Sequence, residues 1–421
     1  MNSWNGSPHC VTLVCLLLAA GLGVSAAQGA IEGITNNVVN LTAKSGYIST
    51  PDAAGGIYIW GYANGTNDAQ YPGPTIIVAQ GSTVTVNLQN QLAVPTSIIF
   101  PGQAGVTASG GMPGLLTSEA ATNGGTVTYT FTASQPGTYL YNSGTRPDLQ
   151  VEMGLVGAII VRPSVSTQAY NHALTAFDTE YLFLLTEMDP SVHALVEQGR
   201  MAEVDTTTFF PVYWFINGRC GPDTLVESNV PWLPCQPYNC APMMYPGQKL
   251  LMRLIGAGRD PHPFHFHGNN ALIVARDGRM LESNPGVSGP DIAESDFTIT
   301  TYPGGTADAI FTWTGAKLGW DIYGHKPGDP MMPNEYAPDH GKAFPVTLPG
   351  LLELTYGEHF SGSPFLGSPG YIPPATFNVN PSGAYMFMWH SHSEKEIVND
   401  DIFPGGMMTM LMIMAPGSMM P

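Results

Sequence analysis

Short segments in which apolar and polar residues alternate make up most of the chain. Ile57 to Tyr62 and Gly81 to Leu88 show the pattern, with an apolar side chain at every second position. This period of two is typical of β-strands with one buried face. The 49 glycines and 37 prolines among 421 residues separate the strands by turns, and only Pro190 to Arg200 favours a short helix. We therefore expect an all-β protein built from β-sandwiches.

The remaining predicted strands fall into two groups on either side of a linker at residues 163–177. They predict two domains, at residues 31–165 and 172–416, the second interrupted by a Pro/Gly/Tyr-rich insertion at about 317–381. The strands are Val38 to Ala43, Tyr71 to Val78, Thr126 to Thr132, Gly137 to Tyr141, Gly154 to Val161, Tyr181 to Leu185, Tyr213 to Gly218, Pro246 to Ile255, His262 to Gly268, Ala271 to Ala275, Phe297 to Thr301, Ala309 to Trp313, Tyr385 to Trp389 and Met407 to Met414.

The N-terminus reads as a secretory signal. An apolar run from Val11 to Val24 precedes the small residues Ser25-Ala26-Ala27, so residues 1–27 fit a cleaved leader. The run is too short to span a bilayer, and no other segment of the sequence has the length and apolarity of a transmembrane helix. We expect an exported protein, located in a periplasm, on a cell surface or outside the cell. The net charge of −18 argues against a nucleic-acid partner.

Three cysteines remain after the predicted leader, all in one Pro-rich loop: Cys220, Cys235 and Cys240. In an oxidising compartment we expect one disulfide among them, with one thiol left over. The sequence does not choose the pairing. A metal site on these cysteines is the weaker interpretation.

Two histidine motifs carry the candidate chemistry. The first is His262-Pro-Phe-His265-Phe-His267-Gly268, and the second is Trp389-His390-Ser391-His392. Residues two apart in a strand share a face, so His265 pairs with His267 and His390 pairs with His392. Four imidazoles on two paired strands would suit copper or zinc. The alternative is that they are ordinary partly buried histidines.

We interpret the lone histidines as surface or loop residues rather than metal ligands. They are His172, His193, His325, His340 and His359. A zinc hydrolase is a weaker reading of the paired histidines, because no carboxylate base lies at a recognisable spacing beside them.

At these motifs the chain resembles the multicopper oxidases, the family of laccases and their relatives. Their last cupredoxin domain carries a His-Pro-x-His-x-His-Gly motif and a later His-Cys-His motif. The first is matched fully, and the second is matched except at Ser391, where the family has cysteine. The resemblance implies two cupredoxin-like Greek-key sandwiches and a copper cofactor. It also implies a homo-oligomer, because two-domain relatives form homotrimers.

The departures from the family pattern concern the copper ligands. The cysteine that binds the family's blue copper is Ser391, and the histidine five residues later is Glu396. His262 remains on that side as a metal-ligand candidate, and Met407 or Met408 resembles the axial ligand. Serine cannot replace a thiolate in a blue-copper site. The family's four histidines of the first domain correspond to Ile99, Pro101, Asn142 and Gly144.

These features predict a copper-binding protein with a reduced site at His265, His267, His390 and His392, with oxidoreductase activity that differs from a standard laccase. The alternative is a non-catalytic structural, assembly or surface-interaction protein on the same scaffold.

The twenty methionines of the chain allow two interpretations. Met408, Met410, Met412 and Met414 share one strand face, which we interpret as a flexible core face. Thioethers also bind Cu(I), so a copper-collecting stripe is the alternative.

Overall fold

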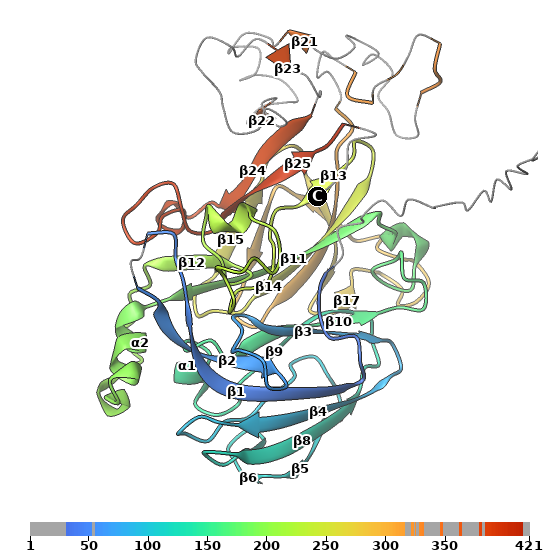
Figure 1. Ribbon diagram of the computed structural model, residues 1–421. Helices are drawn as coiled ribbons and strands as arrows, with labels where there is room; N and C mark the ends of the chain where they lie inside the picture. The colour runs from blue at the N-terminus through green and yellow to red at the C-terminus, as the bar shows by residue number, and fades with distance from the viewer. Residues whose placement is uncertain are drawn as a thin grey trace, which may run out of the picture.

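Two β-sandwiches follow one another along the chain (Figure 1). The computed structural model describes residues 31–52, 55–315, 321–323, 325, 328–331 and 384–415, and the backbone of three two-residue strands between 346 and 380. The blue and teal strands of the first sandwich lie at one end of the molecule in Figure 1, and the red strands β24 and β25 lie toward the other. The all-β prediction is confirmed.

The first sandwich packs a sheet of order β2-β1-β4-β8-β5 on a sheet of order β3-β10-β9. In β4, Val84, Val86 and Leu88 point into the core between exposed or half-buried neighbours, as the alternation predicts. The elements are β1 (Val38–Ile48), β2 (Ile57–Asn64), β3 (Gly73–Ala79), β4 (Thr83–Asn90), β5 (Thr107–Gly110), β6 (Met112–Pro113), β7 (Ser118–Glu119), β8 (Gly125–Thr132), β9 (Gly137–Asn142), α1 (Pro147–Gln150) and β10 (Val156–Arg162).

The second sandwich packs a sheet of order β12-β11-β14-β20-β16-β17 on a sheet of order β13-β25-β24-β15-β19. Most of the predicted insertion at 317–381 lies outside the described residues. The elements are β11 (Thr179–Met188), α2 (Pro190–Glu197), β12 (Tyr213–Ile216), β13 (Met243–Met244), β14 (Lys249–Gly256), β15 (His262–Phe266), β16 (Ala271–Arg276), β17 (Arg279–Met280), β18 (Glu294–Asp296), β19 (Thr298–Thr301), β20 (Thr306–Thr312), β21 (Val346–Thr347), β22 (Gly362–Ser363), β23 (Val379–Asn380), β24 (Tyr385–Ser391) and β25 (Met408–Ile413).

Trp389 fixes which face of β24 points into the second core. Its side chain is fully buried, and its ring centroid lies 5.9 Å from that of Phe183, 5.8 Å from Phe266 and 5.1 Å from Phe311. Burial of a large aromatic side chain among other rings is worth several kcal/mol. The next residue, His390, must therefore point to the opposite face of the sheet.

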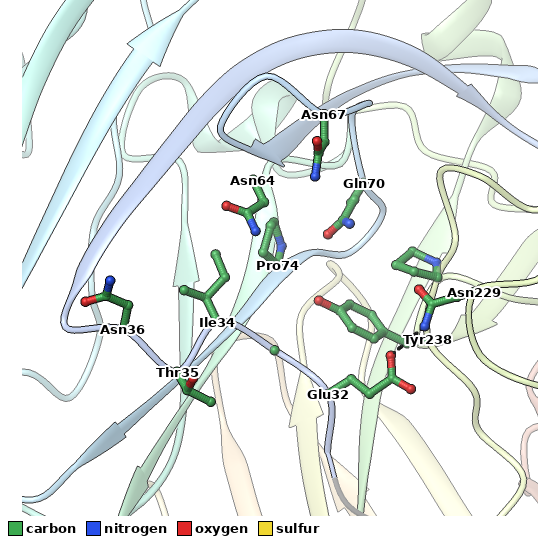
Figure 2. Close-up of a pocket in the computed structure, with 12 residues that line it drawn as sticks. Glu32, Ile34, Thr35, Asn36, Asn64, Asn67, Gln70, Pro74, Asn229 and Tyr238 are labelled. Carbon is green, nitrogen blue, oxygen red and sulfur yellow. Dashed lines mark hydrogen bonds between the residues drawn. The ribbon is translucent and has the colours of Figure 1, made fainter.

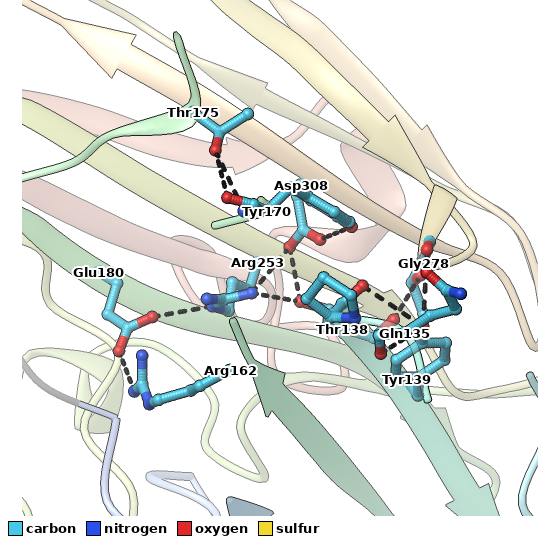
Figure 3. A network of polar contacts seen from close by, with 12 residues as sticks. Gln135, Thr138, Tyr139, Arg162, Tyr170, Thr175, Glu180, Arg253, Gly278 and Asp308 are labelled. Carbon is cyan, nitrogen blue, oxygen red and sulfur yellow. Dashed lines mark hydrogen bonds and ion pairs between the residues drawn. The ribbon is translucent and has the colours of Figure 1, made fainter. Parts of the chain in front are cut away.

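A buried polar network joins the two sandwiches (Figure 3). Arg253 of β14 is fully buried and donates to Glu180 over 2.8 Å and to Thr138 of the first sandwich over 3.1 Å. Thr138 also donates to Asp308 of β20 over 2.5 Å. Arg162, at the end of β10, forms an ion pair with the same Glu180. These contacts fix how the first sandwich sits on the second.

The expectation that His193 is a surface or loop residue is wrong. It lies on α2 with 1% of its surface exposed, and one ring nitrogen is 2.6 Å from the backbone oxygen of Tyr58. The other is 3.4 Å from the carboxylate of Glu152, which is also buried. The helix turns this residue inward against β2, which a lone histidine in a sequence does not reveal.

The disulfide prediction is also wrong, because Cys220, Cys235 and Cys240 are three separate buried thiols. Cys240 packs in the core of the second sandwich and donates to the backbone oxygen of Ile216 over 3.3 Å. Cys220 and Cys235 lie in the apolar cluster between the sandwiches. Burial raises the pKa of all three thiols, so they are protonated at neutral pH.

Candidate metal site

The alternation of β15 and β24 places the histidines on one face of their sheet. In β15 the buried residues are His262, Phe264 and Phe266, so His265 points outward. In β24 Trp389 and Ser391 are buried, so His390 points outward as well. The two strands are antiparallel, and His265 lies directly opposite His390 in the register.

Three imidazoles meet on this outer face. One ring nitrogen from each of His265, His267 and His390 lies within 4.8 Å of the others. The Nε2 atoms of His267 and His390 are 3.3 Å apart. Nitrogens bound at about 2.0 Å to one tetrahedral ion would lie about 3.3 Å apart, so this separation fits a shared metal ion.

His392 lies beside this group but not within it. Its ring centroid is 4.9 Å from that of His265 and 5.9 Å from that of His390. Its side chain is 55% exposed, and Nδ1 is 4.0 Å from the carboxylate of Glu394. The structure thus gathers three of the four histidines predicted to form the site and leaves the fourth at its rim.

Backbone acceptors orient two of the three rings. Nδ1 of His265 is 2.9 Å from the carbonyl oxygen of Phe297, and Nδ1 of His390 is 2.7 Å from that of Ser391. A carbonyl at Nδ1 requires a proton there, which leaves the Nε2 lone pair for a metal. Burial, together with the charge of neighbouring histidines, lowers the pKa of His265 to about 4. Burial also lowers the pKa of His390. Both rings are therefore neutral at pH 7 and competent as ligands.

His262 is held away from the outer group by two carboxylates. Its Nε2 is 2.7 Å from Oε2 of Glu187, and its Nδ1 is 3.0 Å from Oε2 of Glu396. Ser391 donates to the same oxygen of Glu396 over 2.6 Å. Burial would lower the pKa of His262, but the bonds to Glu187 and Glu396 raise it to about 9. An imidazolium that donates hydrogen bonds from both ring nitrogens has no lone pair for a metal.

Glu187 is the member of this buried cluster that the sequence reasoning missed. It is the next-to-last residue of β11, a strand with an apolar run from Leu182 to Leu185. Its other oxygen accepts the backbone amides of Arg259 and Asp260 over 2.5 and 3.0 Å. A charged residue inside an apolar strand signals a buried partner, because an unpaired charge there would be costly. The sequence alone does not say which partner.

In the first sandwich, the two segments at which the resemblance would place further metal ligands pair with each other, but their side chains are not metal ligands. Ile99 and Asn142 form an isolated antiparallel bridge, with reciprocal backbone hydrogen bonds of 2.8 and 3.2 Å. Asn142 turns its side-chain amide to the carbonyl of Ser143. A Cβ at Gly144 would lie 2.7 Å from the side chain of Ile99. These side chains offer a metal at most a weak amide oxygen.

The expectation that the even-numbered methionines of β25 form a core face is wrong for Met410 and Met412, which are half-buried, whereas Met408 is buried. The fully buried residues of this strand are Thr409, Leu411 and Ile413, so the even-numbered methionines point to the outer face. Met408 lies directly opposite His390 in the register. Part of the methionine stripe therefore shares a face with the histidines.

Two hollows of the protein are lined by residues other than the histidine group. One, of 380 Å³, is lined by Asn64, Asn67, Gln70 and Tyr238, with Glu32 at its edge (Figure 2). Its lining contains no histidine or cysteine, so it offers no site for a soft metal.

The other hollow, of 710 Å³, is lined by Asp296, Thr298 and Thr300 among others. None of the three histidines lines this hollow, although the hydroxyl of Thr298, one of its lining residues, is 2.9 Å from Nδ1 of His265.

Most of the first sandwich is similar in sequence to a known protein family. Residues 61–166 match the family model for multicopper oxidases. The chain is multicopper oxidase-like. The multicopper oxidase MCE of Talaromyces pinophilus is 29% identical over 166 residues, which are 37% of this chain and 23% of that protein. Copper resistance protein A of Escherichia coli is 32% identical over 128 residues, 30% of this chain and 20% of that protein. The chain thus aligns with less than a quarter of either relative.

Solved structures show the same fold. The blue copper oxidase of Nitrosomonas europaea superposes with a TM-score of 0.56 at 20% identity, over 89% of this multicopper oxidase-like chain and 85% of that chain. The multicopper oxidase mgLAC superposes with a TM-score of 0.56 at 18% identity, over 91% of this chain and 87% of that chain. Within the described residues, no helix has the length and apolarity to cross a membrane.

Proposed function

We propose that this protein is an exported copper-binding protein with one reduced copper site, held by His265, His267 and His390. The observation that carries the proposal is the meeting of three ring nitrogens within 4.8 Å on one sheet face. His392 would complete the ligand set by a side-chain rotation from the rim. Relatives named multicopper oxidase and copper resistance protein support copper as the metal.

The residues around the site have separate tasks. Phe297 and Ser391 hold the rings through their carbonyls, so that Nε2 of each ring faces the metal position. Copper held by these histidines would supply one-electron redox chemistry. The three imidazoles are half-buried on the outward face of their sheet, which gives a substrate a direct approach to them. We therefore propose oxidoreductase activity by direct contact with substrate, distinct from a standard laccase.

Copper content tests the site. The double variant His267→Ala/His390→Ala should lose at least nine-tenths of its bound copper by elemental analysis, because two of three ligands are gone. Asn142→Ala in the first sandwich is the matched control, and it should retain wild-type copper. Equal copper in both variants, with unchanged circular dichroism, would refute the assignment.

Copper-loaded protein should be colourless. Intense blue absorption requires a copper–thiolate bond, and Ser391 occupies the position of the thiolate. The three thiols are buried, and Cys240 is bonded to a backbone oxygen. A visible spectrum of protein loaded with Cu(II) checks this, and a strong blue band would mean that a cysteine reaches the metal.

The alternative is a non-catalytic structural or assembly protein. The hydrogen-bonded cluster of His262, Glu187 and Glu396 favours it, because the family's electron-donating copper has no place there. If purified protein takes up no copper, this alternative replaces the first proposal. A homo-oligomer, by resemblance a trimer, is part of either proposal, and Leu115, which is 93% exposed, supplies apolar surface for it.

A further inference from the structure

Methionines continue the histidine group along the same face of the sheet. Strands β24 and β25 pair so that Met388 lies opposite Met410, and Met386 opposite Met412. All four side chains are half-buried and point to the outer face, because the residues between them are buried. On the far side of Met412, Met243 of β13 is its partner in the register.

The methionine rows and the histidine rows are neighbours. His390 lies between His265 and Met408 in one row across three strands. In the next row, the backbone amide of His267 bonds to the carbonyl of Met388 over 3.4 Å. Successive rows on one face of a strand are about 7 Å apart. The pair of Met388 and Met410 therefore lies in the row of His267 and about one row from His265 and His390.

The choice of methionine here does not follow from packing. The core on the opposite face is filled by Tyr385, Phe387, Leu411 and Ile413. Half-buried strand positions ordinarily hold β-branched or aromatic residues, which fit a pleated surface better than an unbranched side chain. What methionine adds is a thioether, a soft ligand that selects Cu(I) over harder cations.

Cross-strand geometry lets these thioethers share an ion. Directly opposed residues in an antiparallel pair have Cβ atoms about 4.5–5.5 Å apart. Each methionine has three rotatable bonds, so the sulfurs of an opposed pair can approach one ion from two sides. Two such pairs, one row apart, supply four thioethers.

We propose that Met386, Met388, Met410 and Met412 form a Cu(I) site beside the histidine site. The inference rests on the proposed copper function and adds the oxidation state in which copper is received. The thioethers take Cu(I), whereas the imidazoles of His267 and His390 suit Cu(II). The two sites use different residues, so each can be removed without the other.

The test uses Ag(I), a redox-inert analogue of Cu(I), and the full protein labelled with 13C at the methionine methyl groups. Ag(I) should shift the resonances of the four methionines, in the wild type and in His267→Ala/His390→Ala alike. Met388→Leu/Met410→Leu should bind Ag(I) at least tenfold more weakly, as measured by competition with a chelator. Leucine keeps the volume and apolarity of the side chain.

Met112→Leu, at a 43% exposed methionine of the first sandwich, is the matched control and should bind Ag(I) as the wild type does. The proposal is overturned if Ag(I) shifts none of the four resonances, or if the double leucine variant binds as tightly as the control. Cu(II) content separates this result from the first proposal. The double leucine variant should keep its Cu(II), whereas failure of the histidine site would abolish Cu(II) binding in the wild type.

Discussion

Replacing Arg253 with methionine should lower the free energy of unfolding by about 3–5 kcal/mol, the usual cost of removing one partner from a buried ion pair. The guanidinium is fully buried and bonds to Glu180, and it lies 3.5 Å from Asp308. Without it, two carboxylates remain buried at the joint between the sandwiches. Glu180 keeps only Arg162, and Asp308 keeps the hydroxyls of Thr138 and Tyr170.

Urea unfolding measures this effect. Arg276→Met is the matched control, because Arg276 pairs with Glu294 over 3.0 Å at the surface, where both side chains are at least 40% exposed. Exposed pairs contribute less than about 1 kcal/mol. Similar losses in the two variants would show that the buried network does not hold the sandwiches together.

Glu187→Gln should lower stability by about 3 kcal/mol at pH 6 and by much less at pH 9. The amide keeps one oxygen for the backbone of Arg259 and Asp260 but takes the negative charge from His262. The folded pKa of His262 is about 9, above its ordinary value of 6.5, so the charged ring favours folding. That contribution is complete below pH 6.5 and is lost as the pH rises through 9.

Unfolding of wild type and variant at the two pH values measures the difference. Glu394→Gln serves as the control, because that carboxylate is 87% exposed and should change stability by less than about 0.5 kcal/mol at either pH. A loss in Glu187→Gln that is the same at pH 6 and pH 9 would contradict a charged His262.

The sequence predicted well whatever depends on the period of two. Alternation predicted that His390 and Ser391 point to opposite faces, and the burial of Trp389 shows that Ser391 is on the core side. It also located nearly every long strand of both sandwiches. The pattern does not predict the paired strands β6 and β7, because a strand of two residues is too short to show a period.

What the sequence did not predict depends on contacts between distant segments. Glu187 and His262 are 75 residues apart, and the local sequence of neither strand indicates that the two residues are partners. The face of Met410 was misjudged because apolar residues occupy both faces of β25. Only the buried positions of Leu411 and Ile413 reveal which face is the core.

The buried cluster around His262 also bears on how this lineage can change. Ser391→Cys alone would remove the hydroxyl that donates to Glu396, and Glu396→His alone would set an imidazole against an imidazolium. Coupled residues of this kind have strongly non-additive effects, so each single step passes through a less stable protein. Because proteins sit only slightly above the stability that selection demands, such intermediates are purged. The cluster therefore acts as an evolutionary barrier. It keeps a copper centre from arising at the position of His262, Ser391 and Glu396 through single substitutions.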